Sequence, residues 1–210
     1  MSALSNWLRR KPVESRERPS TNWEEELDAF EAEALRAPRA FQGTPLNRAG
    51  DLCLRAGDRV RALGYYGRAI DVLLGDGQRE AARGVANKII RVHPEAVRTL
   101  CTLTWLDLGS HHMATALMHL RDYVAAAQRG KQEHLAVEQI SAMARVVTEG
   151  EFLTAAADSL DHLGFAEHAV EVREWVRAGA SDEAITDPDS LTAYCLDAAV
   201  GVIERRKDSD

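Results

Sequence analysis

The stretch Leu46-Asn-Arg-Ala-Gly-Asp-Leu-Cys-Leu-Arg-Ala-Gly57, followed directly by Asp58-Arg-Val-Arg-Ala-Leu-Gly-Tyr-Tyr-Gly-Arg-Ala69, decides the fold class. Small residues stand where two packed helices must approach closely, and larger apolar residues stand between them. The small positions are Gly50, Ala62 and Ala69, and the larger ones are Leu46, Cys53, Tyr66 and Ile70. The stretch therefore predicts a closely packed pair of helices.

This pattern resembles one tetratricopeptide unit, a helix pair of about 34 residues that reads W-x2-L-G-x2-Y, then A-x3-F, then P. The first six of these places are taken, in chain order, by Leu46, Ala49, Gly50, Cys53, Ala62 and Tyr66. Leu74 replaces the closing proline of the pattern. The resemblance implies an all-α protein, a tetratricopeptide-like α-solenoid built from antiparallel helix pairs.

A glycine followed five residues later by an alanine recurs along the chain, at Gly57/Ala62, Gly77/Ala82, Gly109/Ala114, Gly150/Ala155 and Gly164/Ala169. We expect each glycine to end a helix in a left-handed conformation, and each alanine to let the next helix pack closely. Pro94 also matches the closing proline of the family pattern. Because the glycines are unevenly spaced, we expect an irregular solenoid, and an ordinary helical bundle is the alternative.

Charge and proline positions divide the chain into five parts. Basic residues dominate its start, acidic residues follow, and prolines or polar residues mark the later breaks. The expected parts are a flexible basic arm at 1–20, an acidic amphipathic helix at 21–38, the repeat domain at 44–180, a linker at 181–187, and a C-terminal helix with a tail at 188–210. We expect the last helix to cap the exposed apolar face of the final repeat.

The sequence also predicts where individual helices begin and end. Thr21 with Glu24 forms a capping-box signature, and Thr44 before Pro45 predicts an N-cap with proline at the first helical position. No segment shows sustained period-2 alternation, so no sheet is expected. The remaining helices are expected at about 45–57, 59–75, 78–92, 95–109, 111–128, 132–148, 151–163, 165–178 and 188–205.

Composition excludes several classes of protein. The 210 residues are 45% hydrophobic and 28% charged, as in a soluble globular protein, and the formal net charge is −7. Nucleic acid is therefore not an expected partner, because phosphate binding requires clustered Lys and Arg. The chain has no run long enough for a membrane span and no signal-peptide pattern, which indicates the cytoplasm. The widely separated Cys53, Cys101 and Cys195 are expected to be buried thiols and not a disulfide framework or zinc site.

One constellation resembles a metal site. Two histidines, His112 and His119, share a predicted helix face with Asp122, and Asp107 and His111 lie nearby in sequence. These are ordinary ligands for a divalent metal. However, no His-x3-His or Glu-x-x-His pair supplies ligands on adjacent turns, so surface histidines near a turn are the favoured interpretation. No phosphate-binding loop or nucleophile motif occurs, and no cofactor is expected.

The N-terminal arm carries a candidate partner-binding group. Trp7 lies beside Arg9, Arg10 and Lys11 in a segment with little local structure to bury an indole. Trp and Arg dominate binding hot spots, and both suit membrane interfaces. An unstructured tail with an incidental tryptophan is the alternative.

The tetratricopeptide resemblance implies a second partner-binding surface. In that family the first helix of each repeat lines a concave groove that receives a peptide or a partner helix. Members that hold a chaperone's C-terminal carboxylate have Lys and Asn where Asn47 and Asp51 stand here, and Asp51 would repel a carboxylate. The groove positions carried over are Thr44, Asn47, Asp51 and Arg55 in the clearest repeat, and Thr99, Leu103 and Asp107 in a later one.

These observations favour a non-catalytic scaffold or adaptor that binds protein partners, or a peripheral cytoplasmic subunit of a larger complex, including a membrane complex. Two alternatives stay open. One is a helical metal-binding protein or metalloenzyme that uses His112, His119 and Asp122. The other is a regulatory module that senses a small ligand in the groove.

Overall fold

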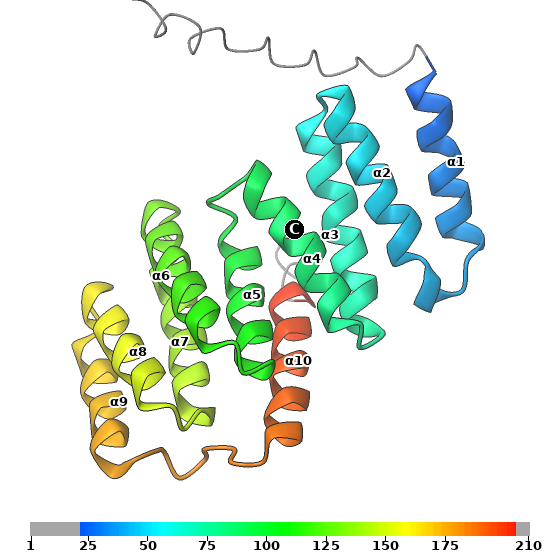
Figure 1. The fold of residues 1–210 in the computed structure, drawn as a ribbon. Helices are drawn as coiled ribbons and strands as arrows, with labels where there is room; N and C mark the ends of the chain where they lie inside the picture. The colour runs from blue at the N-terminus through cyan, green and yellow to red at the C-terminus, as the bar shows by residue number, and fades with distance from the viewer. Residues whose placement is uncertain (1–21, 205–210) are drawn as a thin grey trace, which may run out of the picture.

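A computed structural model describes residues 22–204 of the chain, with side chains to residue 202. Within this part all regular structure is helical and no strand occurs. The elements are α1 (Trp23–Arg36), η1 (Arg39–Phe41), α2 (Gly43–Ala56), α3 (Arg59–Gly75), α4 (Arg79–Val92), α5 (Val97–Gly109), α6 (Met113–Arg129), α7 (Glu133–Val146), α8 (Gly150–His162), α9 (Ala166–Ala178) and α10 (Pro188–Glu204). The fold is an all-α solenoid-like array of helices packed in neighbouring pairs, as expected (Figure 1).

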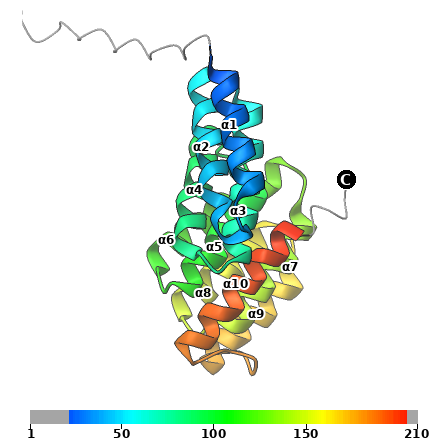
Figure 2. The same cartoon turned by 90° about the vertical axis from the view of Figure 1, so that its right-hand side faces the viewer.

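The helices form two layers, which are seen edge-on in Figure 2. The even layer contains α2, α4, α6 and α8, which contact one another in that order through side chains or packing. The other layer contains α3, α5, α7, α9 and α10, with α5 behind α10 in this view. None of the described helices is long and apolar enough to cross a membrane.

The α2–α3 hairpin shows why small residues are needed at the predicted positions. A Cβ atom at Gly50 would lie 2.5 Å from Cε1 of Tyr66, so only glycine admits the ring at this separation. Ala62 and Ala69 are fully buried on the facing side of α3. The close packing predicted for this stretch is therefore confirmed.

The turn prediction is confirmed at some glycines and wrong at others. Gly57, Gly77 and Gly164 have φ values of 88°, 71° and 88°, in the left-handed region that favours glycine. Gly109, by contrast, is the last residue of α5, and Gly150 is the first residue of α8. Gly109 is required for another reason, because its Cβ would lie 2.8 Å from Cβ of Cys195 in α10.

The C-terminal helix does not cap the last pair of helices, which corrects the sequence expectation. The chain runs from α9 along one end of the molecule and returns as α10 beside α5 (Figure 1). α10 packs most extensively on α5 and also contacts α3, so it fills a place in the middle of its layer. The Thr192 hydroxyl donates a hydrogen bond of 2.6 Å to the Gly109 carbonyl, which fixes the start of α10 against the end of α5.

From Leu100 onward α5 is buried on all sides, because α4, α6, α7 and α10 surround it. Every residue from Leu100 to Gly109 is buried. The Trp105 indole N–H donates a hydrogen bond of 3.0 Å to the Gln139 side chain of α7. A mainly apolar helix that is buried around its whole circumference is typical of the centre of a protein, so α5 is the central element of this fold.

The predicted N-cap of α2 differs from the structure. α2 begins at Gly43 with Gln42 before it, so Thr44 is inside the helix and is not the N-cap. The Gln42 side-chain amide instead donates to the Ala37 carbonyl at 3.0 Å, which holds the turn before α2. α1 begins at Trp23, and Thr21 of the expected capping box lies outside the described residues.

Candidate protein-interaction surface

The first feature of the even layer is a polar bridge between α2 and α4, formed by three of its side chains. Lys88 Nζ lies 2.6 and 2.8 Å from the two carboxylate oxygens of Asp51 and 2.9 Å from the side-chain oxygen of Asn47. The predicted groove residues Asn47 and Asp51 therefore lie side by side on α2. Lys88 was not among the predicted site residues.

This bridge remains accessible from solvent, since the side chains of Lys88 and Asp51 are 31% and 43% exposed. The Tyr66 hydroxyl of α3 donates a hydrogen bond of 2.7 Å to the Asp51 carboxylate. Burial, together with this hydrogen bond, raises the pKa of Tyr66 above its usual range. Because Lys88 neutralises Asp51, the expected repulsion of a carboxylate ligand by Asp51 loses its basis.

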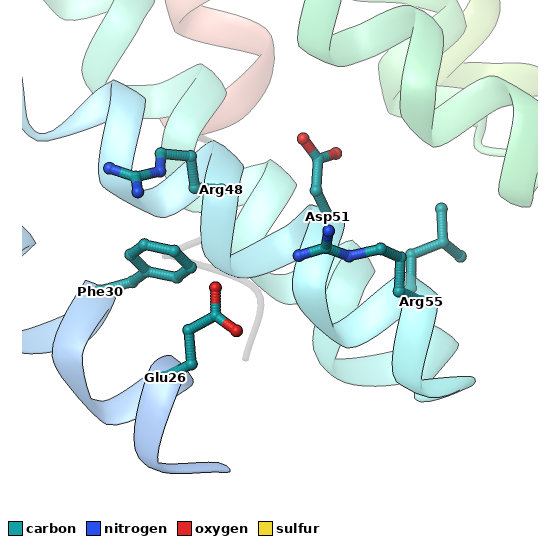
Figure 3. Close-up of a pocket in the computed structure, with 6 residues that line it drawn as sticks. Glu26, Phe30, Arg48, Asp51 and Arg55 are labelled. Atoms are coloured by element: carbon teal, nitrogen blue, oxygen red, sulfur yellow. The ribbon is translucent and has the colours of Figure 1, made fainter. Parts of the chain in front are cut away.

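A groove lies between α1 and α2, with a cavity volume of about 570 Å³. Its apolar surface comes from Phe30 and Leu54, and the Arg48 guanidinium lies 4.3 Å above the Phe30 ring. Arg55 stands on the other side of the opening and points back toward Phe30 (Figure 3). The predicted partner-binding residue Arg55 therefore lines a groove together with Asp51.

A second hollow lies between α6 and α8, also in the even layer, with a volume of about 560 Å³. Its surface is mainly apolar and includes Leu117, Leu120 and Val124 of α6 and Ala155 of α8. Met118 is 43% exposed on the same helix. Sequence reasoning did not identify this hollow, because no spacing rule says which turn of α8 lies opposite α6.

Asp107 and Thr99 do not line the even-layer surface, which corrects the later groove carried over from the resemblance. Asp107 is buried, and its carboxylate accepts hydrogen bonds from His119 Nδ1 at 2.6 Å and from Arg83 at 3.2 Å. Thr99 borders a different cavity of about 470 Å³ between α3 and α5. Leu103, the third carried-over position, is fully buried in α5.

Arg83 extends the buried contact to the surface of the even layer. Its guanidinium also contacts Glu80 at 2.5 Å and Nδ1 of His112 at 2.6 Å. Burial opposes the charge of Arg83, but the hydrogen bonds to Asp107 and Glu80 outweigh it and raise its pKa. Since a guanidinium only donates, the nitrogen of His112 that faces it is the acceptor of this contact.

The candidate metal ligands do not converge in this geometry. His119 is engaged by Asp107 and His112 by Arg83, while Asp122 lies 3.5 Å from Arg121. Across residues 22–202, no three His, Cys, Asp or Glu side chains are grouped so that they could hold a metal ion. His112, the residue before α6, contacts Arg83 of α4, and His119 contacts Asp107 of α5.

All three cysteines are free and buried, as predicted for small apolar positions. Burial raises the pKa of Cys195 to about 12, so its thiol is protonated at neutral pH. Trp7, Arg9, Arg10 and Lys11 lie outside the described residues, and their role stays a prediction.

Comparison of the chain with protein-family models, with curated proteins and with solved structures finds no match. The functional argument therefore depends on the residues described above.

Proposed function

We propose that this chain is a non-catalytic, tetratricopeptide-like interaction protein that holds a protein partner against its even layer. It acts as an adaptor or as a peripheral cytoplasmic subunit of a larger assembly, membrane complexes included. The observation that carries this proposal is the arrangement of the even layer, where an exposed polar bridge and an apolar hollow lie on successive helices.

The two features supply different parts of partner recognition. Lys88 holds the side chains of Asn47 and Asp51 in place, so their remaining hydrogen-bonding capacity is available to a partner without further ordering. The α6–α8 hollow accepts apolar side chains, which provide most of the binding free energy at interfaces. In a partner that spans both features, polar groups at the bridge would provide specificity, and apolar groups in the hollow would provide affinity.

The test is purification of the full-length tagged protein from its native cells under mild conditions, including a detergent-solubilised membrane fraction. We expect a partner at fixed stoichiometry. Leu117→Glu replaces an apolar side chain of the α6–α8 hollow by a carboxylate and should release the partner, because an apolar side chain of the partner would then have to desolvate that charge.

The matched control is Val170→Glu, a change at a side chain that is 52% exposed on α9. Circular dichroism should show that both variants are folded. Recovery of the protein alone, or retention of the partner by Leu117→Glu, would contradict the proposal.

A further inference from the structure

The α1–α2 groove combines an apolar lining with two arginines. Phe30 and Leu54 are its apolar lining residues. Arg48 and Arg55 stand on opposite sides of the opening (Figure 3). A volume of about 570 Å³ is large enough for an indole. An indole that enters the groove would lie beside the guanidinium groups of Arg48 and Arg55, and a guanidinium attracts the face of an aromatic ring through cation–π contact. The groove therefore suits a tryptophan side chain.

Beside this groove, the first turns of α1 carry negative charge that no basic side chain within residues 22–202 balances. Glu24, Glu25, Glu26 and Asp28 are exposed, and none of them pairs with a Lys or Arg among residues 22–202. Further along α1 the situation differs, since Glu33 pairs with Arg48 at 3.5 Å. The surface next to the groove therefore suits a basic segment.

We propose that residues 1–20 of the same chain bind this site, with Trp7 in the groove and the basic residues on the acidic turns of α1. The segment has five basic residues, Arg9, Arg10, Lys11, Arg16 and Arg18, and two acidic ones, Glu14 and Glu17. Its aromatic and basic groups match the two parts of the site, and the charge is opposite to that of α1.

The attachment of the segment to α1 allows this contact within one chain. Trp7 precedes Asn22 by 22 − 7 = 15 residues, which can span up to about 50 Å. The 14 residues of α1 are about 21 Å long, so both Phe30 and Glu26 are within reach. A short tether gives an effective concentration in the millimolar range, so even a weak contact would be well populated.

This inference goes beyond the proposed function, because it assigns an intrachain ligand to one end of the even layer. Trp7 and the basic residues are then stored on α1 and α2 and become available to a partner only when the groove releases them. A partner that binds the arm must compete with Glu26 and Phe30. The outcome can be measured without any partner, so it stands or falls separately from the proposed function.

The experiment uses full-length protein labelled with 5-fluorotryptophan and observed by ¹⁹F NMR. The chain has four tryptophans, and the Trp7 signal is assigned from a Trp7→Phe variant. The reference is a synthetic peptide of residues 1–20 with the same label. We expect the Trp7 signal of the protein to be displaced from that of the peptide and to move toward it at high salt, which screens the charges.

Two variants locate the site. Glu24→Gln/Glu26→Gln removes charge from the first turn of α1, and Arg55→Ala removes one cation from the exposed side of the groove. Each should return the Trp7 signal toward the peptide position. The control Glu171→Gln/Glu174→Gln changes two exposed glutamates of α9 and should leave the signal displaced.

A zero-length carbodiimide cross-link between Lys11 and an acidic residue of α1 is the second readout. Mixing ¹⁴N and ¹⁵N chains separates links within one chain from links between copies. A Trp7 signal at the peptide position in the unmodified protein would overturn the proposal. So would a displaced signal that neither variant moves, or cross-links found mainly between heavy and light chains.

Discussion

Two polar bridges join neighbouring helices of the even layer, and they differ in burial. Between α2 and α4, Lys88 and Asp51 are 31% and 43% exposed. Between α4, α5 and α6, Arg83 is 25% exposed, whereas the Asp107 and His119 side chains are only 1% and 8% exposed. The comparison teaches that a charged cluster becomes buried when its acceptor lies on a helix of the inner part of the fold, as Asp107 does on α5, and not on an outer face, as Asp51 does on α2.

The largest expected effect is at the buried bridge. Asp107→Ala leaves His119 and Arg83 without their shared acceptor, and removing one member of a buried pair costs about 3 to 5 kcal/mol. Chemical denaturation should show a correspondingly lower free energy of unfolding. A loss as small as that of Asp51→Ala would show that burial does not separate the two bridges.

The packing of α10 on α5 can be tested where Gly109 faces Cys195. Gly109→Ala forces a new methyl group against Cys195 and should lower the free energy of unfolding by about 1 to 3 kcal/mol. The control is Gly84→Ala in α4, where the new Cβ meets no atom within 4 Å. This control should stabilise the protein by about 0.5 to 1 kcal/mol, because alanine favours a helix. Equal responses from both variants would contradict the close approach of α10.

The solvent-accessible bridge between Lys88 and Asp51 should contribute less to the free energy of unfolding than the buried bridge at Asp107. Lys88→Ala removes an ion pair that solvent screens, so the expected loss is about 1 kcal/mol or less, and added salt should reduce it further. A double-mutant cycle with Asp51→Ala measures the coupling between the two side chains. Coupling above that of Arg83 with Asp107 would reverse the comparison.

The smallest effect concerns the start of α10. The Ser190 hydroxyl and backbone N–H both donate to Asp187, and these hydrogen bonds lower the pKa of the Asp187 carboxyl below its ordinary value of 3.8. A lowered folded-state pKa means that the stabilisation is present above the unfolded pKa and is lost as the pH falls through the folded one. The difference in melting temperature between the protein and Asp187→Ala should therefore be constant near neutral pH and vanish in acid. A difference that grows in acid would contradict this assignment.

Much of the local structure could be predicted from the sequence. Helical spacing, prolines and turn glycines located the helices to within a few residues, because these signals act over one or two turns. Gly50 and Ala62 were identified as small positions because a hairpin of adjacent helices brings them together. Cys53, Cys101 and Cys195 were identified as buried from their apolar neighbours.

Contacts between distant segments could not be predicted in the same way. Gly109 was assigned to a turn from its spacing to Ala114. Its close approach to Cys195 could not be predicted, because that approach depends on the return of α10 to the centre of the fold. Asp107 is likewise buried by Arg83 of α4 and His119 of α6, which lie 24 and 12 residues away in sequence. Lys88 was missed although it lies 37 residues after Asp51, close to one repeat length of about 34 residues. Comparing positions one repeat apart on the even helices could have found it.

The return of α10 also bears on how the chain acquires its structure during synthesis. In a linear array of repeats each unit contacts only its neighbours, so folding can proceed from the first unit as the chain leaves the ribosome. Here the contact of Thr192 with Gly109 spans 83 residues, and non-local contacts of this kind slow folding. The apolar surface of α5 stays uncovered until α10 has been made. The middle of this protein is therefore the last part to be completed, and it is the region in which a nascent chain would most need protection by chaperones.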